Sequence, residues 1–401
     1  MNFNLDEFIS NRITKRNFSL FKSDLDANAD KIKECVCDKS VLVIGGAGTI
    51  GLNFIKALLI FHPAKLVVVD KNENALTELT RDIRSSYDTV VPKEYKTYPI
   101  DFGDTSFYKL ITNIGPFDIV ANFAAHKHVR SEKDNFSTIE ILKNNILNNI
   151  NLVNFLNQFP PSHFFCVSTD KASNPVNIMG ASKRIMELVI FNNFNSFPVT
   201  SARFANVAFS NGSLLDGFIN RILKRQPISA PNDVKRYFVS PKESGELCLL
   251  ACILGKSNQI FYPKLEFKSM LTFSEISDNF LKHLGYTPYH SSSEDQAKSL
   301  SSNLFDPDKY PVYYFKSNTT GEKLYEEFYT EKEKINEDLY DSVGVIDVSQ
   351  TTHKNDITDL LEQLNMLISD TPNKKEIIVL LKKYINNFSH TEKNKNLDEK
   401  M

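Results

Sequence analysis

The run Val167-Ser-Thr-Asp-Lys-Ala172 brings a hydroxyl, a carboxylate and an amine together in consecutive residues. Thr169, Asp170 and Lys171 directly follow an apolar stretch that predicts a buried strand, so they fall at the end of that strand. An adjacent carboxyl group and amine can serve as general acid and base. Each residue alone is an ordinary surface group, but the set predicts a catalytic site.

A second pair lies on the helix predicted over residues 178–194. Met179 and Lys183 are four residues apart and therefore lie on one face of that helix. A lysine beside the ribose of a nicotinamide hydrogen-bonds the ribose hydroxyls and favours ionisation of a neighbouring acid. The sequence therefore predicts that Lys183 works beside a nicotinamide.

The run Val41-Leu-Val-Ile-Gly-Gly-Ala-Gly-Thr-Ile-Gly51 predicts a site for the rest of a dinucleotide. Its first four residues predict a buried strand, and residues 50–60 predict a helix. Glycines between them allow the backbone to turn tightly and to approach a pyrophosphate, while the free amides of the helix start face the anion. The residues assigned to this phosphate site are Gly45, Gly48, Thr49, Ile50 and Gly51.

A second buried strand, Lys65-Leu-Val-Val-Val-Asp70, ends in a carboxylate roughly twenty residues after the last glycine. A carboxylate at this place accepts from both ribose hydroxyls of an adenosine and repels a 2′-phosphate, which predicts NAD rather than NADP. The alternative is that Asp70 caps the helix that begins near Asn72. Lys71 is assigned to the same cofactor site.

Two further strand ends carry candidate binding residues. Asp101, followed by Phe102, either accepts from the adenine amino group or caps the helix that opens near Asp104. After the next strand, Ala124 and Ala125 let the backbone approach a cofactor.

Lys127 and His128 follow those two alanines and are assigned to the substrate. Lys127 either reaches a phosphate or sugar or is simply solvated. His126 and His128 lack a helical metal-ligand spacing, and we expect no metal. Asn145 is predicted to be a structural brace for the next strand rather than a ligand contact, because buried asparagines need hydrogen-bond partners.

These residues need a scaffold, and strand–helix alternation provides it. Alternation of this kind predicts an α/β fold with a doubly wound parallel sheet of the Rossmann type, in which ligands bind beyond the carboxyl ends of the strands. Strands are predicted at 41–44, 66–70, 95–100, 117–122, 163–168 and 198–203, and helices at 24–36, 50–60, 73–86, 104–113, 134–158 and 178–194.

The predicted organisation has four parts. Residues 1–38 form a helical arm, 39–205 an NAD-binding domain, 206–330 a smaller substrate-binding subdomain interleaved with it, and 331–401 a helical extension. Helices are predicted at 357–367 and 375–385, followed by a disordered tail from Ser389 to Met401, which is rich in lysine, asparagine and glutamate. The two helices either pack on the body or extend a subunit interface, and we expect a homo-oligomer.

Composition excludes several classes of protein. The chain has 401 residues, 41% hydrophobic and 24% charged, with a formal net charge of −2, which argues against nucleic-acid or anionic-membrane binding. Its longest apolar runs are too short to span a bilayer, and the N-terminus lacks a signal pattern. Five scattered cysteines, of which Cys35 and Cys37 are the close pair, form no disulfide framework or zinc spacing. We therefore expect a cytoplasmic protein.

Taken together, these motifs resemble the extended short-chain dehydrogenase/reductase superfamily, and within it the bacterial polysaccharide-biosynthesis nucleotide-sugar 4,6-dehydratases. The similarity covers about residues 20–330. Beyond the glycine turn, Asp70, the Ser168–Lys171 run and Met179-x-x-x-Lys183, it is carried by Arg203-Phe-Ala-Asn-Val207, Ser210-Asn-Gly-Ser213, Gln226-Pro-Ile-Ser229, Lys235-Arg-Tyr-Phe238 and Gly321-Glu-Lys-Leu-Tyr-Glu-Glu327.

The resemblance implies an NAD-dependent lyase that converts UDP-N-acetylglucosamine, or a close relative, to a 4-keto-6-deoxy sugar. Asp170 would be the acid toward oxygen 6, Lys171 the base toward carbon 5, and Thr169 a partner of oxygen 4. Lys183 would orient the nicotinamide ribose. The nucleotide and diphosphate contacts would be Asn206, Arg236 and Glu322, of which Arg236 suits a diphosphate by charge and fork geometry.

Two departures from the family pattern matter. Most of the superfamily has tyrosine at the position of Met179, and a thioether cannot exchange a proton. The change is typical of a methionine-bearing branch of the dehydratases. Asn318-Thr-Thr-Gly321 replaces an Arg-Pro-Gly that usually holds the nucleotide, which leaves UDP and GDP open. A 4-epimerase and a catalytically inactive NAD-binding protein are the rival hypotheses.

Overall fold

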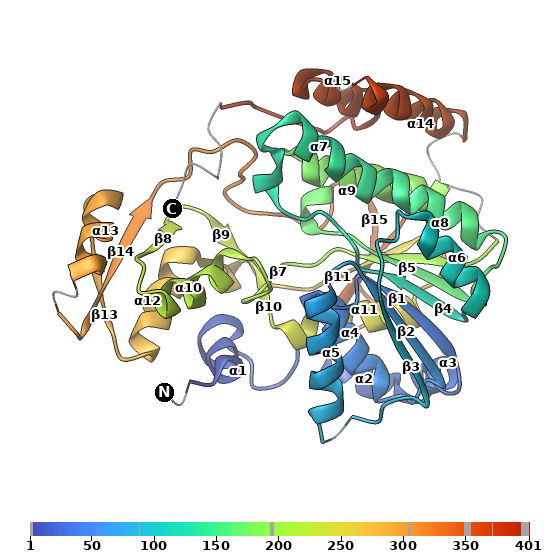
Figure 1. Ribbon diagram of the computed structural model, residues 1–401, viewed down its shortest axis with the longest axis horizontal. Helices are drawn as coiled ribbons and strands as arrows, with labels where there is room; N and C mark the ends of the chain where they lie inside the picture. The colour runs from blue at the N-terminus through green and yellow to red at the C-terminus, as the bar shows by residue number, and fades with distance from the viewer. Residues whose placement is uncertain are drawn as a thin grey trace.

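The structure is a computed structural model that describes residues 3–87, 89–192, 196–303, 306–348, 354–370, 372–393 and 401. It has two parts (Figure 1). One is a large sheet with helices on both faces. The other is a smaller group of helices and short strands, built around α10, α12 and β14.

Within the described residues, nine strands form the large sheet in the order β15-β16-β11-β6-β5-β4-β1-β2-β3. All pairs from β11 to β3 are parallel, which confirms the predicted Rossmann-type sheet. The parallel strands are β1 (Ser40–Ile44), β2 (Lys65–Asp70), β3 (Glu94–Pro99), β4 (Ile119–Asn122), β5 (His163–Val167), β6 (Val199–Ala202) and β11 (Gln259–Pro263).

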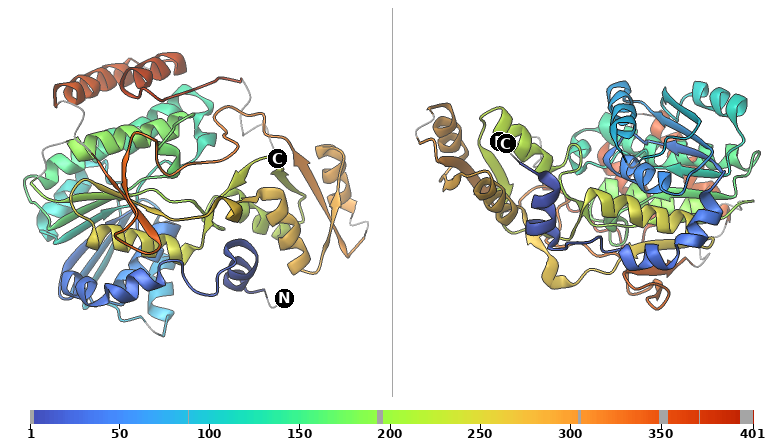
Figure 2. Two further views of the ribbon diagram at one scale, coloured as in Figure 1. Left: turned by 180° about the vertical axis from the view of Figure 1, so that it is seen from behind. Right: turned by 90° about the horizontal axis from the view of Figure 1, so that it is seen from below.

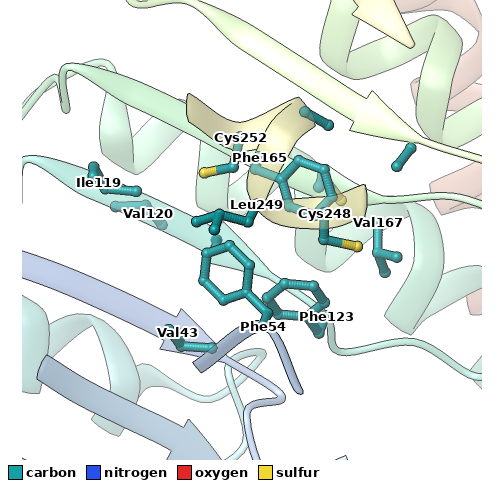
Figure 3. Packing of buried hydrophobic residues seen from close by; sticks show 14 of the residues in the cluster. Val43, Phe54, Ile119, Val120, Phe123, Phe165, Val167, Cys248, Leu249 and Cys252 are labelled. Atoms are coloured by element: carbon teal, nitrogen blue, oxygen red, sulfur yellow. The ribbon is translucent and has the colours of Figure 1, made fainter. Parts of the chain in front are cut away.

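Helices cover both faces of this sheet (Figure 1). One face carries α4 (Thr49–Leu59), α5 (Glu73–Ser85) and α11 (Pro241–Leu254), and the other carries α6 (Thr105–Ile114), α7 (Asn135–Leu142), α8 (Asn148–Leu156) and α9 (Ile178–Asn192). Figure 3 shows how Phe54 of α4 and Leu249 of α11 pack on strand residues such as Val43 and Phe165. Burial of these large apolar side chains stabilises the sheet and fixes the strand ends that carry the polar residues.

The smaller part follows β6 in the chain. Its parallel sheet runs β13-β14-β8, and two short strand pairs, β7 with β10 and β9 with β12, connect it to the large sheet. Its elements are β7 (Asn206–Val207), α10 (Leu214–Leu223), β8 (Ile228–Pro231), β9 (Lys235–Arg236), β10 (Phe238–Val239), β12 (Leu271–Thr272), α12 (Phe273–His283), β13 (Thr287–His290), α13 (Glu294–Asn303) and β14 (Lys309–Phe315).

The two parts interleave along the chain. Within residues 206–330, β11 is a strand of the large sheet and α11 packs against that sheet. The N-terminal arm also reaches across the molecule. Phe8 and Ile9, from α1 (Leu5–Phe8) and the π-helical turn after it, join the apolar core of the smaller part with Phe280.

Two predicted helices are interrupted. The helix expected at 24–36 is α2 (Lys22–Ala27) and α3 (Ala29–Val36), divided at Asn28. Buried Asp24 accepts hydrogen bonds from the amides of Asp341 and Ser342, which ties α2 to the far end of the chain. The helix expected at 134–158 contains a π-helical turn at Lys143–Leu147 between α7 and α8.

The prediction that residues 331–401 are helical is wrong for the first part of that segment. Residues 334–336 form β15 (Lys334–Asn336) and residues 343–347 form β16 (Val343–Asp347), which extend the large sheet in antiparallel fashion. Val343 and Val345 are completely buried, so β16 contributes side chains to the apolar core of the large sheet.

The two C-terminal helices, α14 (Lys354–Ser369) and α15 (Lys374–Tyr384), lie across the outer surface of α7, α8 and α9, as Figure 1 and the left view of Figure 2 show. Leu360, Leu364 and Leu381 pack there against Ile146 and Ile185 in one buried apolar cluster. Of the two alternatives left by the sequence, packing on the body is the one observed.

Substituting one apolar residue in this cluster will destabilise the protein. Leu364 is fully buried, so Leu364→Ala is expected to lower the free energy of unfolding by about 2–5 kcal/mol. Met366, two residues further along α14, is 68% exposed, and Met366→Ala is its control. Urea denaturation of both variants measures the difference, and equal effects would mean that α14 does not rest on α9.

The prediction of a disordered tail from Ser389 onward is wrong for residues 389–393, which contact the body of the protein. Ser389 donates its amide to the carbonyl of Pro175, His390 contacts the carbonyl of Val176, and Glu392 accepts from the hydroxyl of Thr320. Residues 394–400 of the predicted tail lie outside the described residues. Among the described helices, none combines the length and apolar character that crossing a membrane requires.

Candidate active site

The glycine turn between β1 and α4 has the geometry that the sequence predicts. Gly45 has φ +71°, and a Cβ atom there would lie 2.5 Å from the backbone nitrogen of Ala124. A Cβ on Gly51 would lie 2.6 Å from the carbonyl oxygen of Gly45. Only glycine fits either place, because one has a left-handed conformation and both face backbone atoms.

The helix that follows has a free N-terminus. Gly48 is the N-cap of α4, and no side chain in the described part of the chain caps it. A Cβ at Gly48 would meet only ordinary van der Waals contact from the protein. The space left by the missing side chain is therefore open to a ligand. An uncapped N-terminus presents amides and a partial positive charge to an anion.

Asp70 stands beside this turn. Its carboxylate accepts from the amide of Ala47 at 3.1 Å and from the amide of Asn72 at 2.9 Å. It therefore braces the glycine turn and the residue before α5. The N-cap of α5 is Asn72 and not Asp70, so the capping alternative is wrong, and the contact with the adenosine ribose stays a prediction. Lys71 follows Asp70 in the chain, and its Nζ lies 3.4 Å from His126 Nε2.

The cofactor residues predicted from sequence, apart from Lys183, surround one cleft at the carboxyl ends of β1, β2 and β4. Its lining includes Gly45, Gly48, Thr49, Ile50, Gly51, Asp70, Lys71, Asp101, Phe102, Ala124 and Ala125. A glycine cradle with an uncapped helix N-terminus at one end and a carboxylate at the other fits a dinucleotide. Asp101 accepts from the amide of Gly103 and does not cap α6, whose N-cap is Asp104.

A second cleft adjoins the first, and they share Ile50, Phe123, Ala125 and Lys127 in their walls. The predicted catalytic residues all line it, as do three predicted substrate residues. They are Thr169, Asp170, Lys171, Met179, Lys183, Lys127, His128 and Asn206. Residues from the ends of β4, β5 and β6 and from α9 thus converge next to the place where a dinucleotide would end.

Asp170 and Lys171 form a close pair in this cleft. Lys171 Nζ lies 2.9 Å from Asp170 Oδ1 and 3.4 Å from Asn206 Oδ1. The hydroxyl of Thr169 donates to the same Asp170 oxygen at 2.8 Å. The Asp170 side chain is 4% exposed and that of Lys171 is 19% exposed, so a carboxylate and an amine meet in a site with little water.

Lys183 and Met179 lie on the same wall. Lys183 is buried, and its Nζ donates to Met186 Sδ at 3.2 Å, a weak acceptor. Burial lowers the pKa of the Lys183 amine, while Cys166 and Glu187 oppose the shift. Because the thioether is a weak acceptor, the Lys183 amine can donate a stronger hydrogen bond to a ligand oxygen, such as that of a ribose hydroxyl.

Two predicted substrate residues are placed elsewhere. Arg236 is buried outside the walls of both clefts, where it donates to the carbonyls of Lys235 and Leu324 and faces Glu326 at 3.6 Å. Glu322 accepts from the hydroxyls of Ser317 and Thr319 in its own loop. The structure therefore does not bring these two residues to the cleft.

Asn145 is a brace, but for the loop after β4 rather than for the next strand, β5. It accepts from the amide of His126 and donates to the carbonyl of the same residue, both at 2.9 Å, and it also donates to Ser182 on α9. It therefore fixes the loop after β4, which carries Lys127 and His128, against the helix that carries Lys183.

Glu132 is a buried residue near the site that sequence reasoning missed. Its Oε1 accepts from the amide of Met179 at 2.8 Å, so it holds the start of α9. Burial raises the pKa of Glu132 to about 7, although the amides of Met179 and Ile178 lower it. Nothing in the sequence marks this residue, because its charged neighbours resemble a solvated turn.

The raised pKa of Glu132 predicts a pH dependence of stability. A carboxyl group that is protonated more readily in the folded state than in the unfolded state stabilises the protein at low pH, and this contribution is lost as the pH rises from about 4.5 to 7. The loss amounts to about 3 kcal/mol. Glu132→Gln cannot ionise, so its stability relative to the wild type is expected to rise over that range. Denaturation at pH 5 and pH 8 tests this, and an unchanged difference would contradict it.

Comparison with known proteins provides a family. The model for polysaccharide biosynthesis proteins matches residues 41–348. An uncharacterized membrane protein of Methanocaldococcus jannaschii is 31% identical over 328 residues, 79% of this chain and 89% of that protein. The probable polysaccharide biosynthesis protein EpsC of Bacillus subtilis is 26% identical over 81% of this chain and 51% of its own length, so the chain spans about half of EpsC.

Relatives with a named reaction match a smaller share of this chain. The UDP-N-acetylglucosamine 4,6-dehydratase (inverting) of Campylobacter jejuni is 27% identical over 57% of this chain and 67% of that protein. The UDP-glucose 4-epimerase of Rickettsia canadensis is 27% identical over 65% of this chain and 80% of that protein. The named relatives thus include both a dehydratase and an epimerase.

Solved structures share the fold. Pen from Bacillus thuringiensis superimposes with a TM-score of 0.64 at 21% identity, over 82% of this chain and 99% of Pen. A double mutant of the dTDP-glucose 4,6-dehydratase DesIV from Streptomyces venezuelae, solved with NAD bound, gives a TM-score of 0.52 at 20% identity, over 72% of this chain and 87% of that one. Likeness at this identity shows the fold alone.

Proposed function

This chain belongs to the polysaccharide biosynthesis protein family of the extended short-chain dehydrogenase/reductases, and we propose that it is an NAD-dependent nucleotide-sugar 4,6-dehydratase. Its proposed substrate is UDP-N-acetylglucosamine or a close nucleotide-linked N-acetylhexosamine. The observation that carries the proposal is the Asp170–Lys171 pair, 2.9 Å apart in a cleft that adjoins the glycine turn.

The dinucleotide would lie along the first cleft, with its pyrophosphate at Gly48 and the start of α4 and its adenosine ribose at Asp70. Lys183 would hydrogen-bond the nicotinamide ribose at the boundary with the second cleft. Bound NAD supplies the redox chemistry, in which sugar carbon 4 is oxidised to a ketone and carbon 6 is reduced later. DesIV, of the same fold, binds NAD, which supports this choice of cofactor.

Between those redox events, the residues of the second cleft remove water. The 4-ketone acidifies the proton on carbon 5, and Lys171 takes that proton as the general base. The electron pair forms a double bond between carbons 5 and 6, and the bond from carbon 6 to its oxygen breaks. Asp170 donates a proton to that oxygen, so that water leaves. Lys171 then returns a proton to carbon 5 when carbon 6 is reduced.

The first oxidation needs a group that loosens the proton of the 4-hydroxyl, because Met179 cannot take it. Thr169 would hydrogen-bond oxygen 4 and relay its proton to the Asp170 carboxylate, to which the Thr169 hydroxyl donates at 2.8 Å. Asp170 would then carry the proton that it gives to oxygen 6. The buried charge of Lys183 favours the negative charge that develops on that oxygen. Asn206, Lys127 and His128 would contact the sugar and its diphosphate, whereas Arg236 and Glu322 would not.

A 4-epimerase is the second candidate, favoured by the relatives that carry that name. It shares the cofactor and the first oxidation but needs no acid–base pair at carbons 5 and 6. The buried Asp170–Lys171 pair and the methionine at position 179 favour the dehydratase.

One incubation separates these functions. Purified protein is mixed with UDP-N-acetylglucosamine, and in parallel with a GDP-linked hexose, and the nucleotide sugars are analysed by mass spectrometry for water loss and by proton NMR for inversion at carbon 4. The dehydratase forms a product that has lost one water from the UDP sugar. A 4-epimer of unchanged mass would identify an epimerase, and unaltered substrate in both reactions would contradict either enzyme.

A further inference from the structure

A carboxylate that the mechanism above does not use lies next to Lys171. Glu326 belongs to the irregular segment between β14 and β15, and it is 5% exposed. Its Oε1 lies 4.0 Å from Lys171 Nζ and 3.6 Å from Arg236 Nη2. Glu326 does not line either cleft, so it would touch neither sugar nor cofactor.

The charges around this carboxylate are nearly balanced. Lys171, Arg236 and Lys323 approach it within 4.0 Å, and Asp170 Oδ1 lies 2.9 Å from Lys171 Nζ. Burial raises the pKa of Glu326 and Lys171 opposes the shift; Asp170 adds to it, whereas Arg236 opposes it. Glu326 is therefore one member of a buried charge cluster that includes the amine of Lys171.

The position of Lys171 depends on the same contacts. Its ammonium is held by Asp170 at 2.9 Å, by the amide oxygen of Asn206 at 3.4 Å and by Glu326 at 4.0 Å. A base must be neutral before it can take a proton, and each nearby negative charge makes the ammonium harder to deprotonate. Substituting Asp170 would remove the proposed acid. Glu326 is therefore the carboxylate near Lys171 whose charge can be changed separately.

We propose that Glu326 is a positioning residue for Lys171: its charge holds the amine in the cleft and sets the pH above which that amine acts as a base. This inference rests on the proposed dehydratase function, in which Lys171 removes the proton from carbon 5. Arg236 serves the same group, because it lies 3.6 Å from Glu326 and does not line the second cleft.

The test compares two isosteric substitutions in adjacent residues. Glu326→Gln removes the charge beside Lys171. Glu327→Gln is the matched control, since the Glu327 side chain is 46% exposed and contacts Asn174 and Lys323 instead. The ascending limb of the kcat profile for water loss is expected to move to lower pH by about one to three units in Glu326→Gln and to stay in place in Glu327→Gln.

A second readout needs no substrate. Acetic anhydride reacts with neutral amines, so its rate of reaction with Lys171 at each pH, read by peptide mass spectrometry, follows the loss of the ammonium proton. In Glu326→Gln this labelling is expected to begin at lower pH than in the wild type. Unchanged labelling would overturn the inference. Shifted labelling in a protein that never removes water from a sugar would sustain the link between Glu326 and Lys171 while refuting the proposed function.

If Glu326→Gln does not fold, Glu326→Asp provides the same test. It keeps a carboxylate for Arg236 but withdraws the charge from Lys171 by one methylene. Labelling of Lys171 is then expected to shift in the same direction by a smaller amount. An aspartate variant that labels like the wild type would contradict the proposal.

Discussion

Replacing Lys171 by alanine is expected to slow the loss of water from the nucleotide sugar by about 10²–10⁴-fold. The amine is the group placed to take a proton from carbon 5, and its neighbours Asp170 and Asn206 cannot replace it at that position. Asp170→Asn should have a comparable effect, because an amide cannot donate the proton that the departing oxygen needs. Product formation measured by mass spectrometry, with saturating substrate, gives the rates.

Both variants should retain bound NAD, because neither residue lines the cleft of the glycine turn. Lys224→Ala is the control for the loss of a lysine, since Lys224 is exposed beyond the end of α10. Cofactor content is read from absorbance after denaturation. Full activity in Lys171→Ala or Asp170→Asn would remove these residues from the mechanism.

Replacing Arg203 by methionine is expected to lower the free energy of unfolding by about 3–5 kcal/mol. Arg203 is completely buried just after β6, and its guanidinium donates to both carboxylate oxygens of Glu187, at 2.8 and 2.7 Å, and to Glu333. Burial alone would raise the pKa of Glu333, but the hydrogen bonds and charge of Arg203 lower it to about 2. Methionine fills similar space but leaves both carboxylates without their main partner.

This change would also reach the active site. Glu187 accepts from the hydroxyl of Ser168 at 2.6 Å, and Ser168 directly precedes Thr169 and Asp170. Urea denaturation measures the stability, with Arg81→Met as the control because Arg81 lies on the exposed face of α5 with a side chain 71% exposed. Equal unfolding midpoints for the two variants would show that the buried ion pairs add nothing to stability.

Sequence reasoning located the clefts because their chemistry follows the ends of strands. The strands predicted at 41–44, 66–70 and 163–168 contain short apolar runs, and parallel strands bring their carboxyl ends to one edge, where Asp70, Ala124 and Asp170 now stand. Among the missed strands of the large sheet, β16 has such a run, whereas β11 and β15 do not. β11 contains Gln259 and Pro263 but is buried by its neighbours, and β15 is polar and joins the sheet by pairing with β16.

The substrate residues show a second limit. Arg236 and Glu322 were candidates because of their charge, but charge alone does not say which partner a side chain finds. Arg236 meets Glu326, ninety positions further along the chain, and such a pairing depends on the fold. Glu132 was invisible for the same reason, since its burial against the start of α9 has no local signal.

The most direct measurement of the central claim is the mass of the product formed in heavy water. UDP-N-acetylglucosamine is incubated with the protein in D₂O, and the product is analysed by mass spectrometry and NMR. The ammonium of Lys171 exchanges its protons with solvent, so the account predicts a product that has lost one water and gained one deuterium at carbon 5. A sugar of unchanged mass that is inverted at carbon 4 would contradict the account.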